Sequence, residues 1–232
     1  NIFNSAAPMM GVRRLLVVVE DGASAQLLIC DHTQNSEYRY LSSQVVEAYV
    51  GKNASLDIYD IEESSATTAR YSQLFARQQR DSQLLVNGVT LSGGNTRNDY
   101  HIDLVEDNSK TTLAGMAIAS GSQHIDNNTY IKHASTHGMS NQLFKYVLDD
   151  ESTGAFDGVI YVAPDARFTE AYQSNRNLLA SKQARMHTKP QLEIYNDDVK
   201  CSHGATTGQL DADALFYMRS RGIPEKDART ML

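Results

Sequence analysis

The chain has few cysteines, no tryptophan and no long hydrophobic run. Its two cysteines, Cys30 and Cys201, are too few for a disulfide framework in 232 residues, so we expect a reducing, cytoplasmic setting. The longest apolar run, residues 15–19, is far too short to span a bilayer. Acidic residues outnumber basic ones by 28 to 21, and the net charge of −7 argues against nucleic acid or an anionic membrane as the main partner.

A phosphate-binding loop of the GxxxxGK[ST] type is also missing. The nearest glycine cluster, at residues 91–95, lacks the lysine, and we expect it to form a tight turn between strands. Nucleotide hydrolysis by this chain is therefore not expected.

Short β-type runs separated by polar turns dominate residues 12–195. Only four prolines and no long apolar helical stripe interrupt this pattern, so we expect a mainly β protein. The expected strands include residues 15–19, 26–29, 45–50, 56–61, 84–89, 112–118 and 158–162.

A small-residue landmark followed by apolar residues recurs along this region. The landmarks are Gly22-Ala23, Asn53-Ala54, Asp81-Ser82 and Asn108-Ser109, with Asp165-Ala166 about two periods further on. Their second residues follow one another at steps of 31, 28 and 27. Such a degenerate repeat is typical of a solenoid, in which stacked coils share one core. Chance spacing of turns in a β-sandwich is the alternative.

The pattern changes at Asp211, which is suited to cap a helix over residues 212–221. Gly222 suits the position after that helix, and Pro224-Glu225 begins a second helical segment. We therefore expect residues 1–210 to form the β core. Residues 211–232 would be the start of a C-terminal helical region, and the chain would be a piece of a longer protein.

Cys201 and His203 form the strongest candidate site. Residues 191–194 before them are strand-like, and in a continuing strand two residues at i and i+2 lie on one face, under ~7 Å apart. A thiolate and an imidazole could then bind one iron, zinc or copper ion. Two ligands do not complete a metal site, so the others would come from elsewhere in this fold or from another chain.

Three other groups have simpler expected roles. His133 and His137 have the spacing of helical zinc ligands, with His124 and Asp126 nearby, but i and i+4 lie about 13 Å apart on a strand, so we expect structural or surface histidines. We expect Cys30 to be a core thiol. The acidic residues 57, 60, 62 and 63 would suit a carbohydrate-active β-helix enzyme that uses paired carboxylates, although a solvated strand edge also explains them.

Residues 190–232, PQLEIYNDDVKCSHGATTGQLDADALFYMRSRGIPEKDARTML, resemble the C-terminal signature of the SufB/SufD family of SUF iron–sulfur cluster assembly proteins. Residues 91–104, 131–148 and 154–181 also match. Within the family, KCSHGAT at residues 200–206 resembles the SufD branch, because Gly204 occupies the position of a SufB glutamate. The HTKP element at residues 187–190 matches SufB as well, but the SufB cysteine position before it falls on Ala184.

The resemblance implies a right-handed parallel β-helix with helical regions on both sides, of which the N-terminal one is absent here. It also implies a non-catalytic subunit that pairs with a SufB-like paralogue and binds the SufC ATPase through its C-terminal helical region. Cys201 and His203 would lie near the subunit interface, close to the SufB cysteine, and His187 would line the same site. Iron or a nascent cluster would be held only together with SufB. The alternatives are a carbohydrate-active β-helix enzyme and a homodimeric scaffold.

Overall fold

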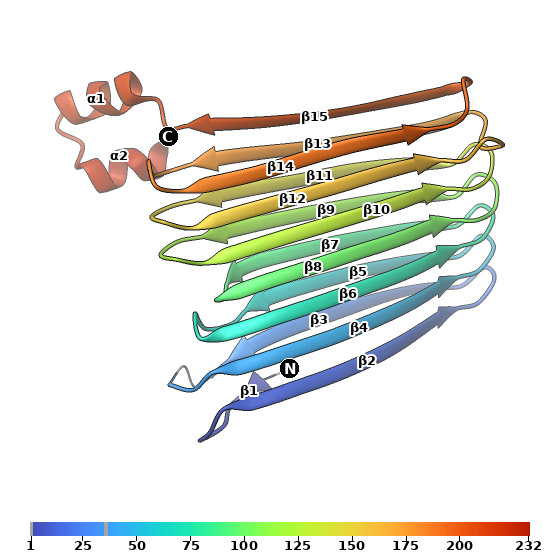
Figure 1. Ribbon diagram of the computed structural model, residues 1–232, viewed down its shortest axis with the longest axis horizontal. Coiled ribbons are helices and arrows are strands. Elements are labelled where there is room, and N and C mark those ends of the chain that lie inside the picture. Colours follow the sequence, from blue (N-terminus) through green and yellow to red (C-terminus); the bar gives the residue numbers. More distant parts are fainter. Residues whose placement is uncertain (1, 35–36) are drawn as a thin grey trace.

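The computed structural model of the protein describes residues 2–34 and 37–232, and its dominant feature is a stack of long strands (Figure 1). The strands form one eight-stranded and one seven-stranded sheet, called here the odd and the even sheet. The odd sheet comprises β1 (Ile2–Phe3), β3 (Ser24–Thr33), β5 (Ser55–Glu63), β7 (Gln83–Ser92), β9 (Lys110–Ala119), β11 (Met139–Leu148), β13 (Thr169–Leu179) and β15 (Val199–Gln209). The even sheet comprises β2 (Met9–Val19), β4 (Tyr40–Val50), β6 (Thr68–Gln78), β8 (Asn95–Leu104), β10 (His124–His133), β12 (Thr153–Val162) and β14 (Arg185–Ile194).

The chain alternates between the two sheets, so each coil contributes one strand to each. Every strand pairs in parallel with the strand two positions away in the chain, as β10 does with β8 and β12. This arrangement is a parallel β-solenoid, and the predicted fold class is confirmed. Since consecutive coils stack in register, a residue about one period earlier in the chain lies directly beneath its counterpart.

The predicted landmarks mark the turns that lead from the even to the odd sheet. Their first residues, Gly22, Asn53, Asp81 and Asn108, have positive φ angles of 72°, 54°, 61° and 60°. Glycine, asparagine and aspartate tolerate this conformation best, which explains the recurring residue types. The last proposed landmark, Asp165-Ala166, is wrong, because it lies three residues before the position that corresponds to the other landmarks. Phe168 has the positive φ in that turn, and the amide of Glu170 bonds to Gly138 of the coil below.

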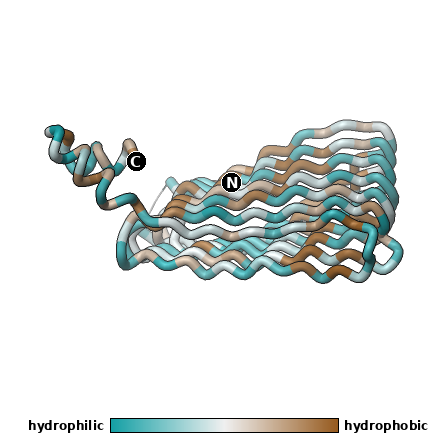
Figure 2. Tube along the Cα trace, turned by 90° about the horizontal axis from the view of Figure 1, so that it is seen from above, coloured by the Kyte–Doolittle hydropathy of each residue, from teal (hydrophilic) through white to brown (hydrophobic). Residues whose placement is uncertain are grey.

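Side chains alternate between the interior of the solenoid and solvent. In β12 every second residue is buried, from Gly154 to Val162, and the inward side chains of the two sheets form the core. Figure 2 shows the resulting alternation of apolar and polar positions along the stacked strands. The face on which a residue lies therefore follows from its position in the strand.

The interior also holds charged groups in the N-terminal coils. The buried guanidinium of Arg70 donates to Asp31 at 2.8 Å, to both oxygens of Asp60 at 2.7 and 2.8 Å, and to Asn98 at 2.8 Å. Burial raises the pKa of the neighbouring Glu62 carboxyl, which accepts hydrogen bonds from Ser64 and Thr96. These groups connect strands β3, β5, β6 and β8 through the core.

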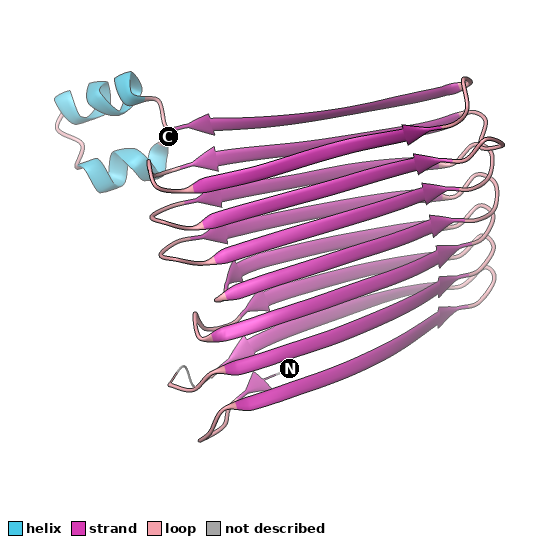
Figure 3. Cartoon of the chain, viewed as in Figure 1, coloured by secondary structure: helices cyan, strands magenta, loops and turns pink. Residues whose placement is uncertain are grey.

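Two short helices follow the last strand and project away from the coils (Figure 3). They are α1 (Ala212–Ser220) and α2 (Glu225–Met231). The Asp211 carboxylate accepts hydrogen bonds from the amides of Asp213 and Ala214, and Gly222 follows α1 with a φ of 86°. The predicted cap, stop and second helix are confirmed. No helix in the described part of the chain is long and apolar enough to cross a membrane.

Candidate functional site

Cys201 and His203 both lie on β15, which is the last strand of the odd sheet. A turn separates β14 from β15, so the strand of residues 191–194 does not continue into them as the sequence analysis supposed. Cys201 and His203 are nevertheless residues i and i+2 of a single strand. Cys201 packs against a buried cluster that includes Ile160 and Ala171 and thus lies on the inward face, and alternation places His203 on the same face.

The thiol of Cys201 is half-buried, whereas His203 is exposed. Burial raises the pKa of the Cys201 thiol, and the hydrogen bond with the backbone of Ala171 only partly offsets this effect. The thiol is therefore protonated at neutral pH in the chain by itself. A nearby cation or metal ion would be needed to make it a thiolate, the form that acts as ligand and nucleophile.

His187 is not on the same face as the Cys201/His203 pair. It pairs with Ala155 in β12, whose neighbours Gly154 and Phe156 point inward. Alternation therefore turns His187 to the outer, solvent-exposed face of the even sheet. The structure brings Cys201 and His203 together and leaves His187 on the other side of the terminal coil.

The two positions at which the chain departs from SufB have different surroundings. Ala184 is buried directly before β14, at the opposite end of that ten-residue strand from the turn to Cys201, roughly 30 Å away at ~3.3 Å per residue. Gly204 follows His203 on β15, and a Cβ added there would meet no atom within 4 Å. A larger residue at Gly204 would thus fit without rearrangement.

Gln173 is a residue of this region that the sequence analysis missed. It lies on β13 as the register partner of His203, with its side chain on the same inward face. Both polar atoms of its amide are buried and have no hydrogen-bond partner, as does Oγ1 of Thr188 on β14. The period of the repeat was the available signal, because Gln173 precedes His203 by 30 residues, or one coil.

The histidine group away from β15 is structural. His133 is fully buried, its Nε2 lies 2.8 Å from the Ser140 hydroxyl, and burial lowers its pKa to about 4. His137 occupies a positive-φ turn and contacts the ring of Phe168. Among the described residues, no group of three or more His, Cys, Asp or Glu side chains could hold a metal ion.

Two expectations from the sequence are wrong. Cys30 is exposed rather than a core thiol, because its neighbours Ile29 and Asp31 take the inward positions of β3. Asp60 and Glu62 are likewise not at a solvated strand edge, since both point into the core beside Arg70. Buried and bonded in this way, they do not line an accessible groove for a glycan.

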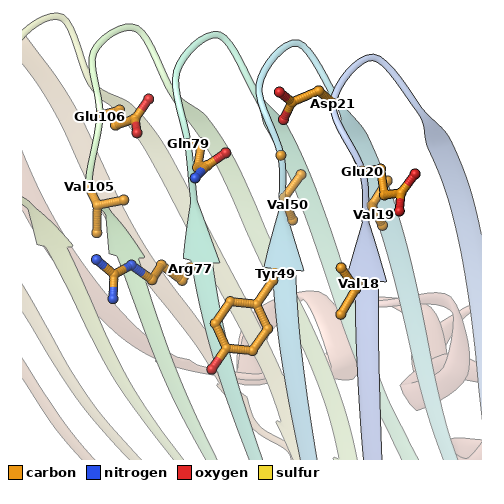
Figure 4. Close-up of a pocket in the computed structure, with 11 residues that line it drawn as sticks. Val18, Val19, Glu20, Asp21, Tyr49, Val50, Arg77, Gln79, Val105 and Glu106 are labelled. Atoms are coloured by element: carbon orange, nitrogen blue, oxygen red, sulfur yellow. The ribbon is translucent and has the colours of Figure 1, made fainter.

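A pocket of about 410 Å³ lies at the far end of the solenoid from β15 (Figure 4). Val18, Tyr49 and Arg77 line it together with three carboxylates of the turns, Glu20, Asp21 and Glu106. Two of these carboxylates accept hydrogen bonds from turn amides, Asp21 from Lys52 at 2.7 Å and Glu106 from Arg80 at 3.2 Å. These interactions give them a role in holding the turns.

The architecture defines a class of protein: a parallel β-solenoid with an inward thiol and imidazole on β15, the last strand of the odd sheet in the described part of the chain. The chain belongs to the SufBD family, since the family described as "SUF system FeS cluster assembly, SufBD core domain" matches residues 2–232.

Individual relatives agree with this assignment. The chain is 35% identical over 232 residues, 97% of its length and 51% of the relative's, to an iron–sulfur cluster assembly SufBD family protein of Synechocystis. It is 39% identical over 152 residues, 66% of this chain and 36% of the relative, to the iron–sulfur cluster assembly protein SufD of Escherichia coli. A chloroplastic protein of Arabidopsis thaliana, ABCI7, is 33% identical over 94% of this chain and 46% of its own length.

The chain thus spans about half the length of the curated relatives it matches, or less. Its general role is in SUF iron–sulfur cluster assembly.

Proposed function

We propose that this chain is the core of a SufD-like subunit that pairs with a SufB-like paralogue and contributes Cys201 and His203 as half of a cluster-assembly site. The observation that carries the proposal is that both side chains lie on the inward face of the last coil. The outer edge of β15 has no neighbouring strand among the described residues, so a partner placed there would cover the pair.

The chemistry of the pair fits iron as cargo rather than as a resident cofactor. Thiolate and imidazole are both ligands that iron accepts in proteins. The raised pKa of the Cys201 thiol keeps it protonated until a metal ion or another cation arrives. His203 can ligate iron or move a proton near neutral pH. We expect no stable cluster on this chain alone, because Cys201 and His203 supply only two ligands. The partner would have to supply the others.

The remaining parts of the proposal concern the whole subunit, and membership of the SufBD family supports them. Residues 1–210 form the β core, and residues 211–232 begin a helical region that docks the SufC ATPase, which hydrolyses the ATP. The subunit itself is non-catalytic and acts in the cytoplasm. His187 is proposed to serve this site from the outer face, in contact with the partner rather than with Cys201.

A homodimer is the second candidate, because a second copy could also cover the free edges of β14 and β15. In a homodimer both copies would have Ala184 and Gly204 where SufB has a cysteine and a glutamate. The second copy would therefore add no thiolate or carboxylate at those positions. The mass of the purified protein across a concentration series decides this: a strict monomer at high concentration removes the homodimer. A glycan-processing enzyme is less well supported, since Asp60 and Glu62 are sealed in the core.

Anaerobic reconstitution of the full-length protein with its SufB-like partner, read by cluster absorbance, tests the site. We expect Cys201→Ser and His203→Ala to lower the cluster yield strongly. Ser202→Ala is the matched control, because Ser202 lies between them and points outward, and it should leave the yield unchanged. Normal assembly after His203→Ala, or a full cluster on the SufD-like protein without its partner, would contradict the shared-site proposal.

A further inference from the structure

Gln173 lies directly beneath His203 in the stack of coils. The two residues are Cα partners in the parallel pairing of β13 with β15, where neighbouring strands run about 4.8 Å apart. Paired residues of parallel strands present their side chains on the same face, so both point into the solenoid. Among the described residues, no further strand of the odd sheet lies beyond His203.

The amide of Gln173 is buried without any hydrogen bond. The residue is only 3% exposed, and neither Nε2 nor Oε1 has a partner. A buried amide left in this state lowers the stability of the fold, so such a group in a native protein needs an explanation. The explanation offered by its position is a bond that forms when the last coil is covered.

The residues around Gln173 keep its amide in this position. Gly158, on the opposite sheet, leaves the space that Gln173 fills, because a Cβ at Gly158 would collide with Nε2 of Gln173. One coil lower, the register partner Gln142 accepts a hydrogen bond from Thr129 at 2.8 Å. In Gln142 only Nε2 lacks a hydrogen-bond partner, whereas in Gln173, the residue paired with His203, both amide atoms lack one.

We propose that Gln173 is a positioning residue for His203. In the covered site its amide oxygen accepts a hydrogen bond from one ring N–H of His203, which fixes the tautomer and directs the other ring nitrogen toward iron. Groups that bond to a ligating histidine in this way orient the ring and raise its basicity. The inference rests on the proposed half-site and adds one residue to it.

Two substitutions of different chemistry separate positioning from a packing role. Gln173→Met keeps the length of the side chain and removes its hydrogen-bonding atoms, while Gln173→Glu keeps an acceptor oxygen at the cost of a buried carboxyl. Gln142→Met is the matched control, since it removes a similar buried amide two coils away from His203. The full-length variants, each with the SufB-like partner, are titrated anaerobically with Co(II) alone, and thiolate-to-cobalt absorbance and the melting temperature are recorded.

We expect Gln173→Met to weaken Co(II) binding by about tenfold, the lower end of the effect of losing such a partner, with an unchanged or higher melting temperature. Gln173→Glu should melt lower but bind Co(II) within about threefold of the wild type, and Gln142→Met within about twofold. A packing role predicts the opposite order, with methionine tolerated better than glutamate.

The proposal is overturned if Gln173→Met binds Co(II) like the wild type, or if Gln142→Met weakens binding as much. Should Gln173→Glu not fold, the comparison of the two methionine variants still decides. His203→Ala is measured in parallel. Unchanged Co(II) binding in that variant would show that the half-site itself is wrong, whereas weakened binding there together with normal binding in Gln173→Met would reject the Gln173 inference alone.

Discussion

Around Arg70, in the N-terminal coils, the interior polar side chains bond to one another, although Oε1 of Gln44 lacks a partner, whereas in the last coils both amide atoms of Gln173 lack one. Arg70 bonds to two carboxylates and one amide, which lie on β3, β5 and β8. In the last coils the amide of Gln173 and the hydroxyl of Thr188 are buried and unbonded. A group that is fully satisfied inside the chain has a structural role. The unbonded amide of Gln173, beside β15, is the group that the proposed partner-covered site would complete.

The same difference applies to the two regions' ionisable groups. Coulombic attraction and a hydrogen bond from Arg70 oppose the effect of burial on Asp31, and its pKa is lowered. Cys201 has no such cation, and burial alone raises its pKa. The N-terminal interior therefore stabilises charge with its own residues, whereas Cys201 would need the cation of the proposed site to become a thiolate.

Replacing Arg70 by methionine is expected to have the largest effect. It would remove the buried cation that bonds to both Asp31 and Asp60, and breaking a buried ion pair typically destabilises a fold by about 3–5 kcal/mol. Urea unfolding of the 232-residue chain measures this. Arg97→Met is the control, because Arg97 forms ion pairs with Asp99 and Asp126 on the exposed outer face and should lose less than about 1 kcal/mol. Equal losses would remove the distinction between interior and surface pairs.

The pH dependence of stability tests the sealed interior at His133. Its folded-state pKa of about 4 lies below the ordinary 6.5, so the unfolded chain takes up the proton first as the pH falls. Between pH 6.5 and 4 the free energy of unfolding should therefore decrease, by about 3 kcal/mol over the full window. The difference between wild type and His133→Gln, measured by urea unfolding at several pH values, isolates this contribution. If the free energy of unfolding depends on pH in the same way in both proteins, His133 takes up a proton as easily in the fold as in the unfolded chain.

Strands were named from the sequence where apolar residues recur, even where the strand also carries charged inward residues, as β5 does with Asp60 and Glu62. β5 and β12 were expected because residues such as Leu56 and Ile160 fill the core. β6 and β8 were not named individually, and they carry Arg70 and Asn98 at inward positions. Only neighbouring coils supply the partners that allow these side chains to be buried, and no local pattern reveals them.

The candidate site could be predicted only in part for a related reason. The spacing of Cys201 and His203 placed them on one face, since alternation along a strand is a local property. Gln173 could not be recognised in that way, because its proximity to His203 depends on the register between coils, which the turn lengths set. The error at Asp165-Ala166 has the same origin: that turn places its positive-φ residue, Phe168, three positions later than the landmark spacing implies.

A smaller effect separates the bonded from the unbonded hydroxyls of the even sheet. Thr96 donates to the buried carboxyl of Glu62 at 2.8 Å, whereas Oγ1 of Thr188 is buried without a partner. Thr96→Val should therefore cost about 1.5–3 kcal/mol, and Thr188→Val should be neutral or stabilise the chain by up to about 1 kcal/mol. Urea unfolding of both variants tests this directly. A clear loss in Thr188→Val would mean that its hydroxyl already has a bonding partner in the isolated chain.

The smallest expected effect concerns two glycines, one in the sealed core and one on the terminal strand. A Cβ at Gly115 would collide with the ring of Phe144, whereas one at Gly204 would meet nothing within 4 Å. Gly204→Ala should change the free energy of unfolding by less than about 0.5 kcal/mol, while Gly115→Ala should destabilise the chain by about 1–3 kcal/mol. If Gly204→Ala proves neutral in stability yet lowers the cluster yield of the full-length protein with its SufB-like partner, the open space at Gly204 is space that the partner uses. Equal destabilisation by both substitutions would instead mean that the terminal coil is as tightly packed as the core.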